Sequence, residues 1–210
     1  MQLSDEFIRE CLAPYQYSPT DRECGAIRTY LQLLETWNRR ISLTSIVDTK
    51  EQLQRLFGES LFAVHFVPIR HGRLADVGTG AGFPGLALKI ASPQLSLTLI
   101  ESNNRKCAFL AEVVRALELS DVKIEGKRFE DFEPADRIFE FVTSRALGNW
   151  DKLLQWSLHR LHGESKVVLW LAKKDAEGIS ANKAWEWREP IRIPDTSTSV
   201  LLIGTSLITD

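Results

Sequence analysis

Residues 76–85 read DVGTGAGFPG, and this stretch decides the fold. It follows a short apolar run and leads into a pattern over 84–91 that is typical of a helix. Gly78, Gly80 and Gly82 stand at every second position, which permits tight turning and lets a ligand approach the backbone closely. The helix that follows leaves unpaired N–H groups facing the glycines. Because so many glycines exceed what a plain turn needs, the stretch predicts a ligand-binding loop.

Two acidic residues, Asp76 and Glu101, indicate which kind of ligand the loop binds. The spacing Gly-x-Gly-x-x-Gly over 80–85 matches the pattern of dinucleotide-binding loops. Asp76, however, stands two residues before the first glycine, where a carboxylate would repel a pyrophosphate and attract an ammonium or sulfonium group. Glu101 follows the apolar run 95–100, and an acid at the tip of a second strand can accept hydrogen bonds from both ribose hydroxyls of a nucleoside. S-adenosylmethionine suits both acids, whereas NAD suits only Glu101.

Two later segments are candidates for the same site. Phe129 and Glu130 follow the apolar run 122–124, in a loop that would border the base of a bound nucleoside. Arg145 follows the apolar run 138–143, where it could contact a phosphate or stack on a base. In an open α/β sheet these strand ends face the crevice in which ligands bind. Each segment can also be read as an ordinary charged surface loop.

Apolar runs alternate with helical patterns from residue 73 onward. The runs that read as strands are 74–77, 95–100, 122–124, 138–143 and 167–171, and the helical patterns between them cover 84–91, 105–117 and 150–161. This alternation predicts an α/β fold with a mainly parallel, Rossmann-like sheet. Residues 185–193 and 200–208 are both strand-like with no helix between them, which predicts a C-terminal antiparallel hairpin in a seven-stranded sheet.

The first seventy residues carry helical signals and few strand signals. Helical patterns cover about 4–12, 20–37 and 51–67. Thr20 and Glu23 are spaced as a capping box, and Pro68 ends the third pattern. The sequence therefore predicts a helical extension over 1–70 and a sheet domain over 71–210, together forming one compact unit.

Composition and charge exclude several classes of protein. The chain has 210 residues, 44% of them hydrophobic and 26% charged, with a formal net charge of −2, which excludes a wholly basic nucleic-acid binder. No run approaches the roughly 20 apolar residues of a membrane-spanning helix. Residues 1–10 carry acids where a signal peptide carries a basic region, so we expect a cytoplasmic protein. Three cysteines without a CxxC pair predict neither disulfides nor a metal site.

Four motifs point to one family. They are DVGTGAGFPGL at 76–86, Glu101-Ser102 with Arg105, Ser144-Arg145-Ala146, and LETWNRRISLT at 34–44. Together they resemble the small-subunit ribosomal RNA methyltransferase G family, also called glucose-inhibited division protein B. The resemblance covers roughly 27–172. It implies a class I methyltransferase fold with an N-terminal helical extension. It also implies S-adenosylmethionine as methyl donor and N7 of a guanine in the 530 loop of 16S ribosomal RNA as acceptor.

The resemblance also implies roles for individual residues. Gly78 and Phe83 would contact the cofactor from the loop. Phe129 and Glu130 match the family's pair that contacts adenosine, and Arg145 matches its arginine beside the cofactor and the target base.

Methyl transfer to guanine N7 needs no general base, because N7 already carries an in-plane lone pair. Catalysis would come from holding the reacting atoms in line in a dry site. Asp76, together with the loop that contains Gly80 and Gly82, would hold the methionine end of the cofactor. Arg145 and Lys173 are the candidate catalytic residues, acting by positioning the base or its phosphate.

Other functions remain open. A class I methyltransferase for a small molecule or a protein would share every cofactor feature. A non-catalytic S-adenosylmethionine-binding protein is favoured only by two departures from the family pattern, Leu56 in place of histidine and Lys174 in place of glycine. An NAD-dependent dehydrogenase is disfavoured by Asp76. We expect 16S ribosomal RNA or the small ribosomal subunit as partner, no membrane contact, and a monomer.

Overall fold

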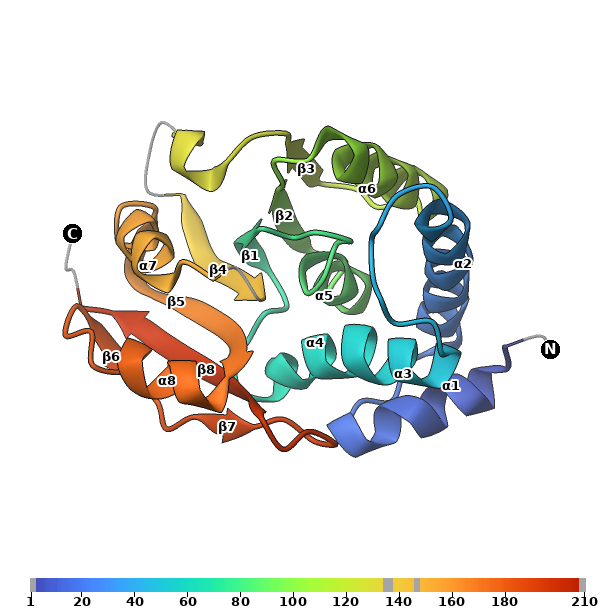
Figure 1. Ribbon diagram of the computed structural model, residues 1–210, viewed down its shortest axis with the longest axis horizontal. Coiled ribbons are helices and arrows are strands. Elements are labelled where there is room, and N and C mark those ends of the chain that lie inside the picture. The colour runs from blue at the N-terminus through green and yellow to red at the C-terminus, as the bar shows by residue number, and fades with distance from the viewer. Residues whose placement is uncertain (1–2, 134–137, 146–147, 208–210) are drawn as a thin grey trace.

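A computed structural model describes residues 3–133, 138–145 and 148–207 (Figure 1). Within these residues the strands form an eight-stranded sheet in the order β3-β2-β1-β4-β5-β8-β6, and β7 also pairs with β8. The strands are β1 (Gly72–Val77), β2 (Leu95–Ile100), β3 (Val122–Glu125), β4 (Phe139–Arg145), β5 (Leu161–Ala172), β6 (Trp185–Trp187), β7 (Ile191–Arg192) and β8 (Ser199–Ser206). Ala146 and Ile208, which belong to the motif and the tail strand discussed above, lie outside the described residues.

The first five strands are parallel to one another, and β8 runs antiparallel to β5, β6 and β7. The expected α/β class, with a mainly parallel sheet and an antiparallel C-terminal part, is therefore confirmed. The strand order reverses at β1, which pairs with β2 on one side and β4 on the other. In open α/β sheets the ligand crevice lies outside the carboxyl ends of the strands at such a reversal.

Side chains along the strands alternate between two hydrophobic clusters on opposite faces of the sheet. Leu74 and Val168 belong to one cluster, and their chain neighbours Ala75 and Leu169 belong to the other. In Figure 1, α2, α5 and α6 lie on one side of the sheet and α7 on the other, in agreement with the helices that contribute to each cluster. The sheet is thus the middle layer of three.

The helical segments follow the expected order. They are α1 (Asp5–Leu12), η1 (Ala13–Tyr15), α2 (Asp21–Asn38), α3 (Thr49–Gln52), η2 (Leu53–Gly58), α4 (Glu59–Phe62), η3 (Ala63–His65), α5 (Gly85–Ala91), α6 (Asn104–Ala116), η4 (Phe129–Asp131), α7 (Trp150–Leu158) and α8 (Lys173–Ile179). Thr20 and Glu23 form the expected capping box at the start of α2. None of the helices among the described residues is long and apolar enough to cross a membrane.

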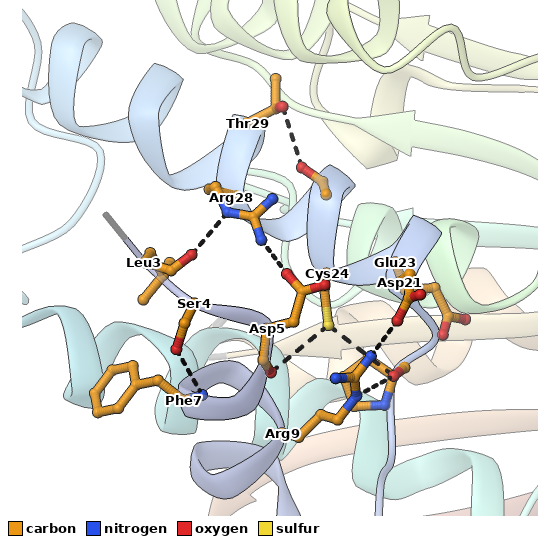
Figure 2. Close-up of polar contacts among 12 residues, drawn as sticks. Leu3, Ser4, Asp5, Phe7, Arg9, Asp21, Glu23, Cys24, Arg28 and Thr29 are labelled. Atoms are coloured by element: carbon orange, nitrogen blue, oxygen red, sulfur yellow. Dashed lines mark hydrogen bonds and ion pairs between the residues drawn. The ribbon is translucent and has the colours of Figure 1, made fainter. Parts of the chain in front are cut away.

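Two arginines, Arg9 and Arg28, connect α1 with α2 through hydrogen bonds and ion pairs (Figure 2). Arg28 Nε donates to Leu3 O at 2.8 Å, and the same guanidinium pairs with Asp5. Arg9 Nε donates to Pro19 O at 3.1 Å in the connection between the two helices. These contacts hold the two helices together, and the core cluster that both share with β1 and β2 holds them against the sheet domain.

Several expectations differ in detail from the structure. The strand expected over 167–171 is longer and spans Leu161–Ala172 as β5. The helix expected over 51–67 begins at Thr49 and contains a π-helical segment in its middle. The helix expected over 150–161 ends at Leu158, and α8 was not foreseen. The strand expected over 185–193 is divided into β6 and β7, so the sheet has eight strands rather than seven. Pro190, which has no N–H to give to a neighbouring strand, lies at the division.

Candidate functional site

Asp76 lies underneath the glycine loop and holds its shape. Its side chain is completely buried at the end of β1. Oδ2 accepts hydrogen bonds from Thr79 Oγ1 at 2.5 Å and from Gly85 N at 2.9 Å, and Oδ1 accepts one from Thr143 Oγ1 at 2.8 Å. Burial raises the pKa of Asp76 to about 6, although these hydrogen bonds favour the ionised form. Asp76 therefore joins the loop, the start of α5 and the neighbouring strand β4.

This position differs from the one expected for Asp76. The sequence suggested an acid at the strand tip that attracts an ammonium or sulfonium group of the ligand. In the structure both carboxylate oxygens of Asp76 already accept hydrogen bonds from protein groups, and no part of the side chain reaches solvent. In this arrangement Asp76 supports the loop from below.

Glu101 connects the loop to β2. Its Oε2 accepts a hydrogen bond from Gly80 N at 3.0 Å, and its Oε1 accepts one from Asn103 N at 2.8 Å. Gly78 N donates to Ile100 O at 2.9 Å, which places the first glycine beside the same strand end. The structure thus brings Gly78, Gly80 and Glu101 together, as the sequence predicted for a nucleoside site.

The two sides of the loop have opposite surroundings. A Cβ atom on Gly82 would overlap the Tyr30 hydroxyl and come within 2.6 Å of Leu86. A Cβ atom on Gly80 would meet only Gly78 O, at 3.9 Å. One side of the loop is therefore packed against protein, and the other is open next to the Glu101 carboxylate. Glu101 itself is 8% exposed. An open backbone beside a carboxylate is an arrangement in which a ligand can approach the loop closely.

Phe83 faces the N-terminal helices. Its ring stacks on Tyr30 at 5.1 Å between centroids and meets Phe57 edge-on at 5.0 Å. Tyr30 Oη also donates to Ala81 O at 2.5 Å. Only 6% of Phe83 is exposed. The Phe83 side chain therefore anchors the loop to α2 and η2.

Arg145 ends β4 and is paired with an acid that the sequence analysis did not single out. Its Nη2 lies 3.0 Å from Glu59 Oε2, and its Nη1 donates to Arg55 O at 2.6 Å. The Arg145 side chain is 18% exposed and that of Glu59 9%. Burial lowers the pKa of Arg145 and raises that of Glu59, while the attraction between the two opposes both shifts. A lone acid within the apolar stretch LFGESLF at 56–62 was the signal that could have identified Glu59.

The comparisons with known proteins agree on one family. A family model described as rRNA small subunit methyltransferase G matches residues 23–191. The chain belongs to this family. A "Ribosomal RNA small subunit methyltransferase G" from Stutzerimonas stutzeri is 35% identical over 75% of this chain and 71% of the relative. One from Dichelobacter nodosus is 33% identical over 82% of this chain and 81% of the relative.

Solved structures support the fold of this methyltransferase G chain. A SAM dependent methyltransferase from Aquifex aeolicus has a TM-score of 0.65 at 14% identity, covering 85% of this chain and 98% of that one. A precorrin-6y C5,15-methyltransferase from Geobacter metallireducens has a TM-score of 0.55 at 13% identity, covering 80% and 95%. These likenesses show the fold alone.

Phe129, Glu130 and Lys173 are the remaining expected residues of the methyltransferase G chain. Phe129 is 8% exposed and meets Trp156 edge-on at 6.0 Å, whereas the adjacent Glu130 is exposed. Lys173 begins α8 and is exposed, and its backbone N donates to Thr198 O at 2.7 Å. It lines a cavity that none of residues 76–85 lines.

The two departures from the family pattern have different surroundings. Leu56 is 7% exposed and belongs to the core cluster, so it fills apolar space. Lys174 is exposed at the start of α8. Neither departure touches the glycine loop through a hydrogen bond or an ion pair in the part of the chain that the structure describes.

Proposed function

We propose that this chain transfers a methyl group from S-adenosylmethionine to N7 of a guanine in the 530 loop of 16S ribosomal RNA. The observation that carries the proposal is the glycine loop, with its open side next to Glu101, in a chain of the methyltransferase G family. The substrate is the RNA or the small ribosomal subunit, which would place the reaction in the cytoplasm. The working form is a monomer.

The loop and the adjacent strand end would bind the cofactor. When bound, S-adenosylmethionine supplies an electrophilic methyl group to N7, whose lone pair accepts it without loss of a proton. Glu101 would accept hydrogen bonds from the ribose hydroxyls in place of, or together with, Gly80 N. Phe129 and Glu130 would border the adenine. Asp76 would keep the backbone N–H groups of the loop in a fixed arrangement.

Arg145 would hold the target nucleotide at the reacting position. Its guanidinium carries five N–H donors, and the contacts with Glu59 and Arg55 leave further donors for a phosphate or a base edge. Because both partners of Arg145 lie on the helical segment 49–65, this segment sets the direction of the guanidinium. Catalysis would then depend on orientation, with no side chain acting as a base.

Transfer of labelled methyl groups tests the proposal. The acceptors are 16S RNA and small subunits that lack the modification, and the labelled base is identified after digestion. We expect label at guanine N7, reduced at least about 100-fold by Arg145→Ala because a positioning contact is lost. Arg115→Ala, on the exposed end of α6, is the matched control and should retain activity. Cofactor binding without labelled RNA would contradict the proposed substrate.

A further inference from the structure

A cavity of about 750 Å³ lies between α8 and the strands β6, β7 and β8. Its volume is that of a pocket for a nucleotide-sized ligand. Figure 1 shows α8 beside these strands in the orange and red C-terminal part of the chain, apart from the glycine loop between β1 and α5. The methyl-transfer site proposed above does not use this cavity.

Three cations from different elements line the cavity. They are Lys173 of α8, Arg188 after β6 and Arg192 of β7, and all three are exposed. Arg188 Nη1 donates to Phe66 O at 2.9 Å, and Arg192 Nε donates to Thr196 O at 3.2 Å. These single hydrogen bonds orient the guanidinium groups and leave further N–H donors for a ligand. Such a group of donors suits a phosphate.

The cavity also has an aromatic wall and a hydroxyl without a partner. Trp187 lines it, and the indole is held by a hydrogen bond from its Nε1 to Asn182 O at 3.0 Å. Ser180, also in the lining, has a buried Oγ for which the described part of the chain provides no hydrogen-bond partner.

Two carboxylates distinguish a nucleotide from a simple anion. Glu177 and Glu189 line the same cavity and are exposed. They can accept hydrogen bonds from a ribose 2′-hydroxyl or from the amino group of a base, and a simple anion offers no such donors. Cations, acceptors and an aromatic wall together match the three parts of a ribonucleotide.

One end of the cavity, at Ser199 and Val200, lies at the same edge of the sheet as Arg145. Arg145 ends β4 and pairs with Trp170 of β5, and Ala172 at the end of β5 pairs with Ser199 of β8, which lines the cavity. Two strand spacings separate β4 from β8, on the order of 10 Å. The Arg145 side chain lies on the face of the sheet covered by α4, so a single RNA strand that passes it can cross this edge of the sheet and reach the near end of the cavity, beside α8, within a few nucleotides. The match to the family model ends at residue 191, so Arg192 lies just outside the matched region.

We propose that this cavity binds one unpaired ribonucleotide that flanks the target guanine. Its phosphate lies against Lys173 and Arg192, its base against Trp187, and its 2′-hydroxyl within reach of the carboxylates. The inference rests on the proposed function and adds a second RNA contact, built by the C-terminal strands. It assigns Lys173 to this contact rather than to the reacting base.

Equilibrium binding of a 16S fragment that contains the 530 loop, measured without methyl donor at several salt concentrations, tests the inference. Arg192→Glu should raise the Kd about tenfold and lower the slope of log K against log salt by about 0.7 to 1, since one phosphate contact is lost. Arg115→Glu is the matched charge reversal, because it lies in the last turn of α6 at the opposite edge of the sheet. It should change the Kd far less. Thermal unfolding of both variants checks that they fold.

Separate measurements of RNA binding and of product formation distinguish a failure of this inference from a failure of the proposed function. Equal effects of Arg192→Glu and Arg115→Glu would overturn the cavity as an RNA site, even if the wild type methylates the RNA. Failure of the wild type to bind the fragment would also overturn it. Loss of binding in Arg192→Glu, together with a wild type that binds but does not methylate, would support the cavity and contradict the proposed reaction.

Discussion

Glu59 and Arg145 form a pair that is largely shielded from solvent, between α4 and the end of β4. In Glu59→Gln the amide keeps the shape but loses the charge that orients the guanidinium. We expect kcat for methyl transfer to fall about tenfold, with the Kd for S-adenosylmethionine unchanged, because only the target-side contact is disturbed. Steady-state kinetics and calorimetry measure the two quantities.

Glu51→Gln provides the control on the same helical segment. Glu51 pairs with Arg55 at 2.9 Å, but both side chains are about half exposed, and such surface pairs contribute little. A kcat that falls equally in both variants would show that Glu59 has no special role in positioning Arg145.

The raised pKa of Asp76 predicts a dependence of stability on pH. The folded state holds this proton more tightly than the unfolded state, so Asp76 lowers stability as pH rises from its ordinary pKa near 4 to about 6. Asp76→Asn cannot ionise. The free energy of unfolding of the wild type should therefore fall relative to that of the variant by about 3 kcal/mol across this range. Urea unfolding at a series of pH values gives both curves, and parallel curves would contradict the assignment.

At the scale of elements, the glycine loop predicts unequal effects of two similar substitutions. Gly80 and Gly82 both have positive φ angles, 58° and 90°. Alanine at either position lowers stability by about 1–2 kcal/mol, because a Cβ atom disfavours a positive φ angle. Only at Gly82 does the new Cβ atom also meet Tyr30 and Leu86. Chemical denaturation should show Gly82→Ala destabilised by at least about 2 kcal/mol more than Gly80→Ala. Equal losses would argue against the packed loop.

The contact between α2 and the loop predicts that the N-terminal helices influence cofactor binding. Tyr30→Phe keeps the ring stacked on Phe83 but leaves Ala81 O without its buried donor, at a cost of about 1–3 kcal/mol. The Kd for S-adenosylmethionine should rise several-fold in a titration. Tyr17→Phe removes a comparable hydroxyl, which donates to Glu23 at 2.9 Å instead of to the loop, and should leave the Kd unchanged.

Strands and helices with a clear apolar period could be predicted from the sequence. The run 95–100 became β2 with the expected bounds, and the pattern 105–117 became α6 within one residue at each end. The π-helical segment Leu53–Gly58 could not be predicted, because its apolar residues fit an α-helix equally well. The division at Pro190 was visible in the sequence, yet the flanking apolar residues suggested a continuous strand.

At the scale of the whole molecule, the sequence indicated which residues lie near the loop but not where their side chains point. Asp76 and Phe83 both belong to the motif, yet both are turned into the protein, Asp76 toward β4 and Phe83 toward α2. Their directions depend on Thr143 and Tyr30, which are far away in the chain. Only the packing of the N-terminal helices and the sheet brings these partners together, so local patterns could not reveal it.

We propose that residues 1–70 and 71–210 unfold as one cooperative unit, because the N-terminal helices share a core cluster with β1 and β2. Leu34 of α2 is completely buried in that cluster. Leu34→Ala should lower the global stability by about 3 kcal/mol. Native-state hydrogen exchange should then show equal loss of protection in α2 and in the distant β1 and β2, since all three open only by global unfolding. Gln32→Ala, on the exposed side of the same helix, should leave all three unchanged. If Leu34→Ala weakened protection in α2 alone, the helices would be a separately unfolding layer, and the loop would keep its shape without them.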